Sequence, residues 1–365
     1  MVREADLYTG LVLDGRWRID GYKNSGHFSI VLHGVDLSTG DPVAVKVLKL
    51  NSTPEAVEEM QGEIELLGAL APCDRVVDIK GHGKHIQVMT ATSPSGPIAI
   101  PIAVSYVVLE LAEASLADLL VMLDQVAWPE RLKLFRDVVK GVHQMHLRRT
   151  VSRDLKSDNI LLFVDAGGTV TTAKVADLGR ARRTNQPARF SANDYVAGRG
   201  DLRFAPPECL WFQAVDDPAY WVAVDLYHLG SVLFELAVGH GVTSVVLPDA
   251  MHIYRTMQGL DEASRRAEYK ARTPELRARM EIAWELFEQA VPSAIRPQAS
   301  ALLRQLTEPD PALRLPRTVG GRPMRSSNGL EWLLRKTDIL RLGLHRAEVQ
   351  AATLARRKQS RNVHA

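Results

Sequence analysis

The sequence has few cysteines, little net charge and no long uninterrupted apolar run. Its 365 residues include only Cys73 and Cys209, which excludes a disulfide framework and leads us to expect a reducing, cytoplasmic compartment. Neither cysteine has the His or Cys neighbours of a metal site, so both are interpreted as small core residues. The formal net charge of +2 is too small to indicate a nucleic-acid or membrane partner.

The sequence also lacks the patterns of export and of membrane insertion. The first ten residues, MVREADLYTG, carry charges where a signal peptide needs its apolar segment, so export is not expected. The most apolar later stretch, 222–238, is interrupted by Asp225, His228 and Glu235. It is therefore interpreted as a buried helix and not as a membrane span.

What the chain does have is the composition of an ordinary globular protein, with 46% hydrophobic and 24% charged residues. Because a single hydrophobic core normally stops growing near this chain length, we expect two lobes. A cleft between lobes is a common place for a ligand.

The most informative stretch is 151–162, VSRDLKSDNILL, in which Asp154 is followed by Lys156 and Asn159 before an apolar run. Phosphoryl transfer requires a carboxylate that accepts the hydroxyl proton, a cation beside the migrating group and an oxygen ligand for magnesium. This stretch supplies all three. Taken alone, it also fits a charged surface loop.

The same stretch resembles the catalytic loop H-R-D-L-K-x-x-N of eukaryotic-type Ser/Thr protein kinases, with Ser152 in place of the histidine. The resemblance covers about residues 17–317. It implies an α+β, bilobal protein-kinase-like fold, with a small antiparallel sheet and one helix in the first lobe and a larger, mainly helical second lobe. The implied segments are an N-terminal extension (1–16), the small lobe (17–111), the large lobe (112–317) and a linker with a helical extension (318–365).

Alternation of apolar and polar residues predicts three antiparallel strands within 17–49. The first turn lies where the family has its glycine-rich phosphate cover, with Asn24, Gly26 and Ser29 at the three glycine positions. A plain hairpin turn is an equally good interpretation. The resemblance implies that Val31 covers the adenine, where a core valine is the alternative.

Lys46 interrupts the apolar strand 43–48 and costs stability unless its ammonium group finds a partner. The local sequence VAVK matches the V-A-I-K of the family, which implies that Ala44 lines the nucleotide site and that Lys46 contacts the α- and β-phosphates. An outward-facing lysine is the alternative. A helix is predicted over 53–70, and the resemblance implies that its Glu63 pairs with the lysine. The competing glutamates on this helix are Glu58, Glu59 and Glu65.

Residues 76–92 are expected to form another strand pair, followed by a Pro/Gly/Ser insertion at 93–97. The next strand, 106–111, leads by resemblance into the hinge between the lobes. The residues that the resemblance places around the adenine there are Leu109, Glu110 and Ala112.

From Ser115 the periodicity becomes helical, and His143 and His146 are interpreted as helix-face or core residues. A hairpin is predicted over 160–175, and it ends in a D-L-G sequence. By resemblance to the D-F-G of the family, Asp177 in this sequence binds magnesium beside Asn159.

The polar, basic stretch 180–200 corresponds to the activation segment and is expected to be a mobile loop. Thr184, Ser191 and Tyr195 are candidate phosphorylation sites in it, and Arg153 is the candidate partner of the phosphate.

Structural roles follow from further matches. Glu208, in an A-P-E-like sequence, is expected to pair with Arg314 of a D-P-x-x-R sequence, and Asp225 to hold the backbone of the catalytic loop. Asp201 stands where the family usually has threonine. Residues 247–291 are interpreted as a docking surface or, alternatively, a solvated face, and 330–357 as a helix that packs on the large lobe.

Together these matches imply Mg·ATP-dependent phosphorylation of Ser or Thr in a protein substrate, with autophosphorylation in the activation segment. Lys156 favours Ser/Thr over Tyr acceptors. A pseudokinase that acts as a nucleotide-binding scaffold is the first alternative, motivated by Ser152, Asp201 and the reduced glycine turn. A small-molecule kinase is the second, although such enzymes lack the A-P-E region and its arginine partner.

Overall fold

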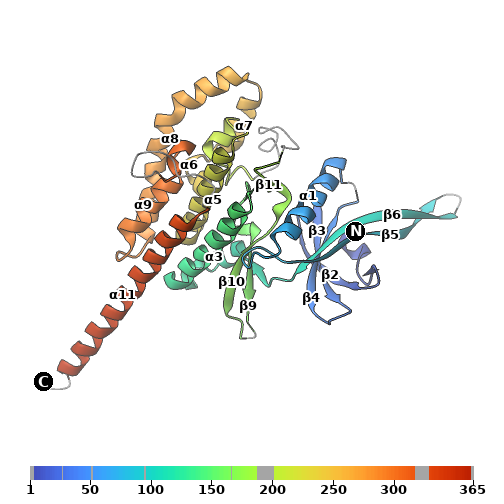
Figure 1. The fold of residues 1–365 in the computed structure, drawn as a ribbon, viewed down its shortest axis with the longest axis horizontal. Coiled ribbons are helices and arrows are strands. Elements are labelled where there is room, and N and C mark those ends of the chain that lie inside the picture. The colour runs from blue at the N-terminus through green and yellow to red at the C-terminus, as the bar shows by residue number, and fades with distance from the viewer. Residues whose placement is uncertain are drawn as a thin grey trace. The chain divides into compact units, whose positions relative to one another are not determined.

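The computed structural model describes residues 4–26, 28–50, 52–93, 96–165, 167–186, 201–316 and 329–362. The chain forms two compact units. Unit 1 comprises Met1–Glu113 and Ala176–Arg180, and unit 2 comprises Ala114–Val175 and Ala181–Ala365. An antiparallel sheet dominates the first and helices dominate the second, which confirms the predicted α+β class (Figure 1).

Unit 1 contains a six-stranded antiparallel sheet in the order β1-β2-β3-β4-β6-β5. Its strands are β1 (Val12–Leu13), β2 (Trp17–Ser25), β3 (Ser29–Asp36), β4 (Pro42–Leu48), β5 (Ile79–Ser93) and β6 (Gly96–Glu110). The three strands predicted within 17–49 are therefore present. The expected strand pair at 76–92 is wrong, because this segment is the single strand β5 and its partner β6 begins at Gly96. Residues 98–104, to which the sequence analysis assigned no element, extend β6.

The two faces of this sheet have different surroundings. Ile30, Leu32, Val45 and Val47 lie on one face and belong to a buried apolar cluster. That cluster includes residues expected to form only an N-terminal extension, namely Ala5, Tyr8 and Leu13, near the 3₁₀ helix η1 (Glu4–Leu7). The opposite face carries Lys46, because successive side chains of a strand point to opposite sides.

Helix α1 (Pro54–Leu70) begins at the N-cap Thr53, whose hydroxyl accepts a hydrogen bond from the Ala56 N–H. Its apolar side includes the buried residues Leu66, Leu67 and Leu70. A carboxylate, Glu63, is buried on the same helix.

Unit 2 is built around α5 (Pro218–Val238), which packs against α3, α8, α9 and α10. The helices of this unit are α2 (Leu116–Leu120), η2 (Leu123–Gln125), α3 (Trp128–Leu147), η3 (Ser157–Asn159), α4 (Pro207–Leu210), α5, α6 (Val242–Val246), α7 (Ala250–Gln258), α8 (Glu262–Ala290), α9 (Arg296–Leu306), α10 (Pro311–Arg314) and α11 (Glu331–Asn362). Its short strands are β7 (Ala114–Ser115), β8 (Thr150–Val151), β9 (Ile160–Val164), β10 (Val170–Val175) and β11 (Arg182–Arg183). The predicted hairpin is β9 with β10.

Helix α5 is long and apolar enough to cross a membrane by length and composition, but 94% of its most apolar window is buried inside the protein. It begins at Asp217, whose carboxylate accepts the Ala219 N–H, and ends at Gly239 in the left-handed conformation. A buried core helix was predicted for this stretch, and the burial confirms it.

The C-terminal helix α11 packs along α3 (Figure 1). Arg136 of α3 forms an ion pair with Asp338 of α11, with 2.6 Å between Nε and Oδ1. Just before α11, the Leu330 N–H donates to Nδ1 of His143 at 2.8 Å. His143 is therefore a packing residue on the helix face, as interpreted from the sequence.

Candidate functional site

Lys46 lies near the middle of β4, directly across from Val31 of β3 and Val107 of β6. Its Nζ donates to both carboxylate oxygens of Glu63, at 3.0 and 2.7 Å. It also donates to Oδ1 of Asp177 at 3.1 Å. The side chain is only 13% exposed, so the alternative of an outward-facing surface lysine does not hold.

The charges around Lys46 keep its ammonium group protonated. Burial alone would lower the pKa of Lys46, but the nearby carboxylates of Asp177 and Glu63 raise it well above its usual value. Glu63 is the buried glutamate of α1, whereas Glu58 and Glu65 are exposed and Glu59 is half-buried. The register of the helix therefore selects Glu63 among the four candidates.

Asp177 lies two residues after the end of β10 and adopts a left-handed backbone with φ of 52°. An aspartate tolerates this conformation better than most residues. The following 3₁₀ helix, η4 (Leu178–Arg180), begins with the fully buried Leu178, whose N–H donates to Glu63 Oε1 at 3.3 Å. Leucine thus fills the apolar position that phenylalanine has in the family, and the Asp177 carboxylate is 53% exposed.

Of the residues expected around the adenine, Val31, Ala44 and Leu109 share the Lys46 face of the sheet. Val31 lies across from Lys46, and Ala44 lies across from Leu109. Side chains that lie opposite each other in neighbouring strands point to the same face. One contact was not foreseen: Nζ of Lys23 donates to the Ala112 carbonyl oxygen at 2.9 Å. The Glu110 carboxylate accepts a hydrogen bond from the Asp78 N–H at 2.7 Å.

The turn expected to cover the phosphates is a hairpin in this structure. Asn24 lies across from Val31, and the Gly26 N–H donates to the Ser29 carbonyl oxygen at 2.9 Å. Neither Asn24 nor Gly26 has a positive φ. His27 lies outside the described residues, so the phosphate-binding role of this turn stays a prediction.

In unit 2 the catalytic loop is held by hydrogen bonds within itself. Nδ2 of Asn159 donates to the Asp154 carbonyl oxygen at 2.7 Å and to Asp154 Oδ2 at 3.3 Å. Because these bonds engage the amide nitrogen, they leave Oδ1 of Asn159 as the atom suited to bind a cation. The loop brings Asp154 and Asn159 together, as the sequence predicted.

Asp225 of α5 binds the backbone of this loop through hydrogen bonds. Its two oxygens accept the backbone N–H groups of Ser152 and Arg153, at 3.0 and 2.8 Å. Oδ2 also lies 2.7 Å from Nε2 of His146, a contact that the sequence analysis did not identify. Burial would raise the pKa of Asp225, but His146 and the two N–H groups lower it, so the carboxylate stays ionised.

Further charged groups surround Lys156. Burial would raise the pKa of Asp201, but hydrogen bonds from Arg203 and the charge of Lys156 lower it. Burial raises the pKa of the Glu235 carboxyl to about 7, although hydrogen bonds from Ser157 oppose the shift. Glu235 is 1% exposed and was treated in the sequence only as an interruption of an apolar run.

Two of the candidate regulatory residues, Ser191 and Tyr195, lie outside the described residues. Thr184 is described, and both its N–H and its hydroxyl donate to the Arg149 carbonyl oxygen, at 2.7 and 3.2 Å. Arg153 is buried, with its guanidinium 5.1 Å from the centre of the Trp221 ring.

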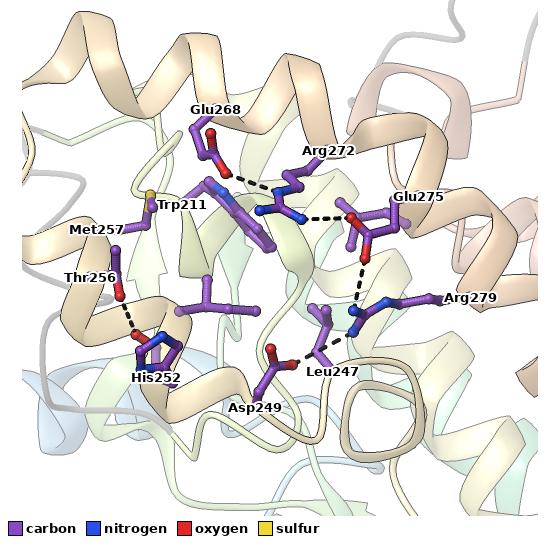
Figure 2. A pocket seen from close by; sticks show the side chains of 12 residues that line it. Trp211, Leu247, Asp249, His252, Thr256, Met257, Glu268, Arg272, Glu275 and Arg279 are labelled. Carbon is purple, nitrogen blue, oxygen red and sulfur yellow. Dashed lines mark hydrogen bonds and ion pairs between the residues drawn. The ribbon is translucent and has the colours of Figure 1, made fainter.

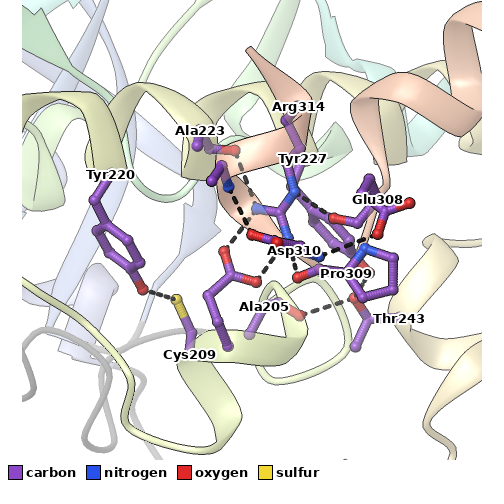
Figure 3. A network of polar contacts seen from close by, with 12 residues as sticks. Ala205, Cys209, Tyr220, Ala223, Tyr227, Thr243, Glu308, Pro309, Asp310 and Arg314 are labelled. Carbon is purple, nitrogen blue, oxygen red and sulfur yellow. Dashed lines mark hydrogen bonds and ion pairs between the residues drawn. The ribbon is translucent and has the colours of Figure 1, made fainter. Parts of the chain in front are cut away.

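The Glu208–Arg314 pair is present and fully buried. Two short bonds join them, Nη1 to Oε1 at 2.6 Å and Nη2 to Oε2 at 2.7 Å. Arg314 also donates to the carbonyl oxygens of Ala223 and Glu308 (Figure 3). These bonds tie α4, α5 and α10 together and satisfy a charge that would otherwise be costly to bury.

The region 247–291 contains a pocket of about 160 Å³ between α7 and α8 (Figure 2). Trp211, Leu247 and Leu276 contribute its apolar surface. The charged groups at its edge are already paired: Arg272 binds Glu268 and Glu275, and Arg279 binds Glu275. This pairing is typical of a solvated helix face.

Comparison with known proteins agrees with these arrangements. The model of the family described as "Protein kinase domain" matches residues 24–319. Mitogen-activated protein kinase 16 of Arabidopsis thaliana is 30% identical over 242 residues, which are 65% of this chain and 38% of that protein.

Two further relatives match at similar identity. Mitogen-activated protein kinase 10 of Oryza sativa subsp. japonica is 28% identical over 319 residues, covering 84% of this chain and 48% of the relative. Serine/threonine-protein kinase ATG1 of Mycosarcoma maydis is 28% identical over 248 residues, which are 62% of this chain and 24% of that protein. The matched part is thus less than half of each relative. Since the family match extends over most of the chain, and the Lys46–Glu63 pair and the loop contacts of Asp225 accompany it, the chain belongs to the protein kinase family.

Proposed function

We propose that this chain is a Mg·ATP-dependent protein kinase that phosphorylates Ser or Thr hydroxyls. The observation that carries the proposal is the buried Lys46, which binds Glu63 and Asp177 at once. A lysine held protonated on the face that also carries Val31 and Ala44 is suited to a nucleotide phosphate.

The residues fit magnesium and ATP by their donor chemistry. Magnesium is usually bound by one or two carboxylates together with substrate phosphates and water, so a cage of several protein ligands is not required. Asp177 offers a half-exposed carboxylate, and Asn159 offers Oδ1. When bound, the metal would neutralise charge on the phosphates.

The remaining roles belong to the catalytic loop. Asp154 accepts the proton of the acceptor hydroxyl, and Lys156 places a positive charge beside the migrating phosphoryl group. Asp225 fixes the backbone that presents both, through the N–H groups of Ser152 and Arg153. The Ser/Thr preference rests on Lys156 and on the similarity to a serine/threonine-protein kinase, ATG1 of Mycosarcoma maydis. Autophosphorylation within 180–200 is part of the proposal.

The test is transfer of labelled phosphate from ATP by the purified chain in the presence of magnesium, with mapping of the modified sites. Asp154→Ala removes the proposed base and should lower transfer by about 10²- to 10⁴-fold, without loss of nucleotide binding. Asp158→Ala, which removes an exposed carboxylate from the same loop, is the matched control and should retain transfer. Equal labelling by wild type and Asp154→Ala would contradict the proposal.

A second candidate is a pseudokinase that binds nucleotide without transferring phosphate. The replacement of two glycines by Asn24 and Ser29 in the first turn favours it. So does Asp201, which stands near Lys156 where the family usually has threonine and binds Arg203. Nucleotide binding by thermal shift, together with no labelling of the chain or of a basic protein substrate, would select this candidate.

A further inference from the structure

The hairpin of β5 and β6 is longer than the sheet that holds it. β4 pairs with β6 only from Val47↔Tyr106 to Val43↔Glu110. The pairing of β5 with β6 continues outward from there to Ser93↔Gly96. The part formed by 86–93 and 96–103 is therefore a two-stranded ribbon that extends past the other strands of unit 1 (Figure 1).

This ribbon exposes apolar side chains and has no charge. Ile86 and Val88 of β5 are 68% and 57% exposed, and Ile98 and Ile100 of β6 are 48% and 43% exposed. No Asp, Glu, Lys, Arg or His occurs from residue 86 to residue 109, in a chain that is 24% charged. A two-stranded ribbon is marginally stable by itself, and an exposed apolar surface commonly marks a place of association.

The two edges of the ribbon differ because β6 contains two prolines. Pro101 lies across from Val88, and Pro97 lies across from Thr92. Proline has no N–H, so both must occupy non-hydrogen-bonded pairs, with their nitrogens turned to the outer edge of β6. That edge is thereby short of donors and poorly suited to accept another strand.

The outer edge of β5 has no such block. In an antiparallel ladder, the residues across from Pro97 and Pro101 also turn their backbone groups outward, so Ile86, Val88 and residues 90 and 92 present N–H and C=O groups. β5 is the last strand in the sheet order, and no described strand pairs with this edge.

We propose that the outer edge of β5, residues 86–92, pairs antiparallel with the same edge of a second copy of this chain. A two-fold axis at Val88 places Ile86 across from residue 90 of the second copy and joins two ribbons into one four-stranded sheet. An uncharged, extended strand with a free edge is the required partner, and a second copy supplies one.

The charges beside the ribbon agree with this register. Lys84, the nearest charged residue on β5, would lie across from residue 92 of the second copy. The two Lys84 side chains would then be eight residues apart along the strands, roughly 27 Å, where salt screens their repulsion. Insertion into a lipid bilayer is the less favourable alternative, because a two-stranded ribbon leaves backbone groups of both edges unpaired in hydrocarbon.

Sedimentation velocity of the full chain over a wide concentration range tests the proposal. We expect the wild type to pass from a monomer of 40.4 kDa to a species of twice that mass. Val88→Pro removes an outward N–H while sparing the bonds to β6, and should weaken association by about tenfold or more, since both symmetry-related donors are lost. Ile98→Lys, on the proline-blocked strand, is the matched control and should dimerise like the wild type.

Each variant must first show the thermal unfolding midpoint of the wild type. A wild type that stays monomeric at every concentration would overturn the proposal. So would a loss of dimer in Ile98→Lys equal to that in Val88→Pro, because it would indicate stacking of ribbon faces and not pairing of edges. Binding of a monomer to phosphatidylcholine vesicles, lost in Val88→Pro, would replace the second copy by a membrane.

Discussion

Several ionisable side chains of this protein are buried, and charged groups or hydrogen bonds nearby offset the cost of burying the charges discussed next. Lys46 lies between Glu63 and Asp177, and Asp225 accepts two backbone N–H groups and contacts His146. Because an unpaired buried charge costs several kcal/mol, such pairs set the position of the loops that carry them.

Glu235 should make stability depend on pH. Burial raises the pKa of its carboxyl from 4.5 to about 7. Between these pH values the unfolded chain has lost the proton and the folded chain retains it, so this group favours the folded state at low pH. The contribution is lost as the pH rises through this window, by at most about 1.4 kcal/mol per pH unit.

Urea unfolding from pH 5 to 8 measures this effect. Glu235→Gln should remove the slope, so the difference in unfolding free energy between wild type and variant should change across the window. Glu262→Gln, on the exposed first turn of α8, should leave the slope unchanged. A constant difference between wild type and Glu235→Gln would contradict the assignment.

At the scale of elements, the start of α11 depends on a glycine. Gly329 has φ of 58°, and a Cβ there would lie 2.5 Å from Nδ1 of His143, where the Leu330 N–H donates. Any other residue at this position would have a strained left-handed backbone, and its Cβ would clash with the packed His143 imidazole.

Gly329→Ala should therefore loosen α11 from α3 and lower the unfolding free energy by about 1–3 kcal/mol. Limited proteolysis should cut the C-terminal helix faster in this variant. Gly68→Ala is the control, because it lies inside α1 with open space around it, and it should stabilise the protein by about 0.5–1 kcal/mol. Unchanged proteolysis in Gly329→Ala would argue against this role.

At the scale of the whole molecule, the chain folds as two compact units with separate cores. One core lies between the sheet of unit 1 and its N-terminal residues, and the other surrounds α5. Proteins with more than one such unit commonly depart from two-state unfolding.

If the two units unfold separately, the calorimetric enthalpy of unfolding should exceed the van't Hoff enthalpy. Arg314→Met leaves the Glu208 carboxylate buried and without its arginine partner. The unfolding free energy of unit 2 should therefore fall by about 3–5 kcal/mol, and its transition should move to lower temperature. Ile19→Ala, in the core of unit 1, should instead lower the unfolding free energy of unit 1 and move its transition to lower temperature. A single transition that both variants shift equally would show that the units unfold together.

The sequence by itself placed Asp154, Lys156 and Asn159 in one short stretch, because they are only two to five residues apart. It also offered four glutamates on one predicted helix as candidate partners of Lys46. It also indicated the burial of α5, since its apolar run is long and is interrupted at only a few positions, among them Asp225, His228 and Glu235. The choice of Glu63 among four glutamates came from the resemblance, and the helix register bears it out by burying that residue alone among them.

Only the tertiary structure decided the contacts between distant segments that no pattern marks. Lys23 reaches Ala112, and His146 reaches Asp225, across 89 and 79 residues. The length of the β5–β6 ribbon was likewise missed, because 93–97 was interpreted as an insertion, whereas the ladder pairs Pro97 with Thr92 and Pro101 with Val88. The physical reason is the same throughout: local sequence specifies backbone preference and periodicity, whereas register and burial arise only when segments far apart in the chain pack together.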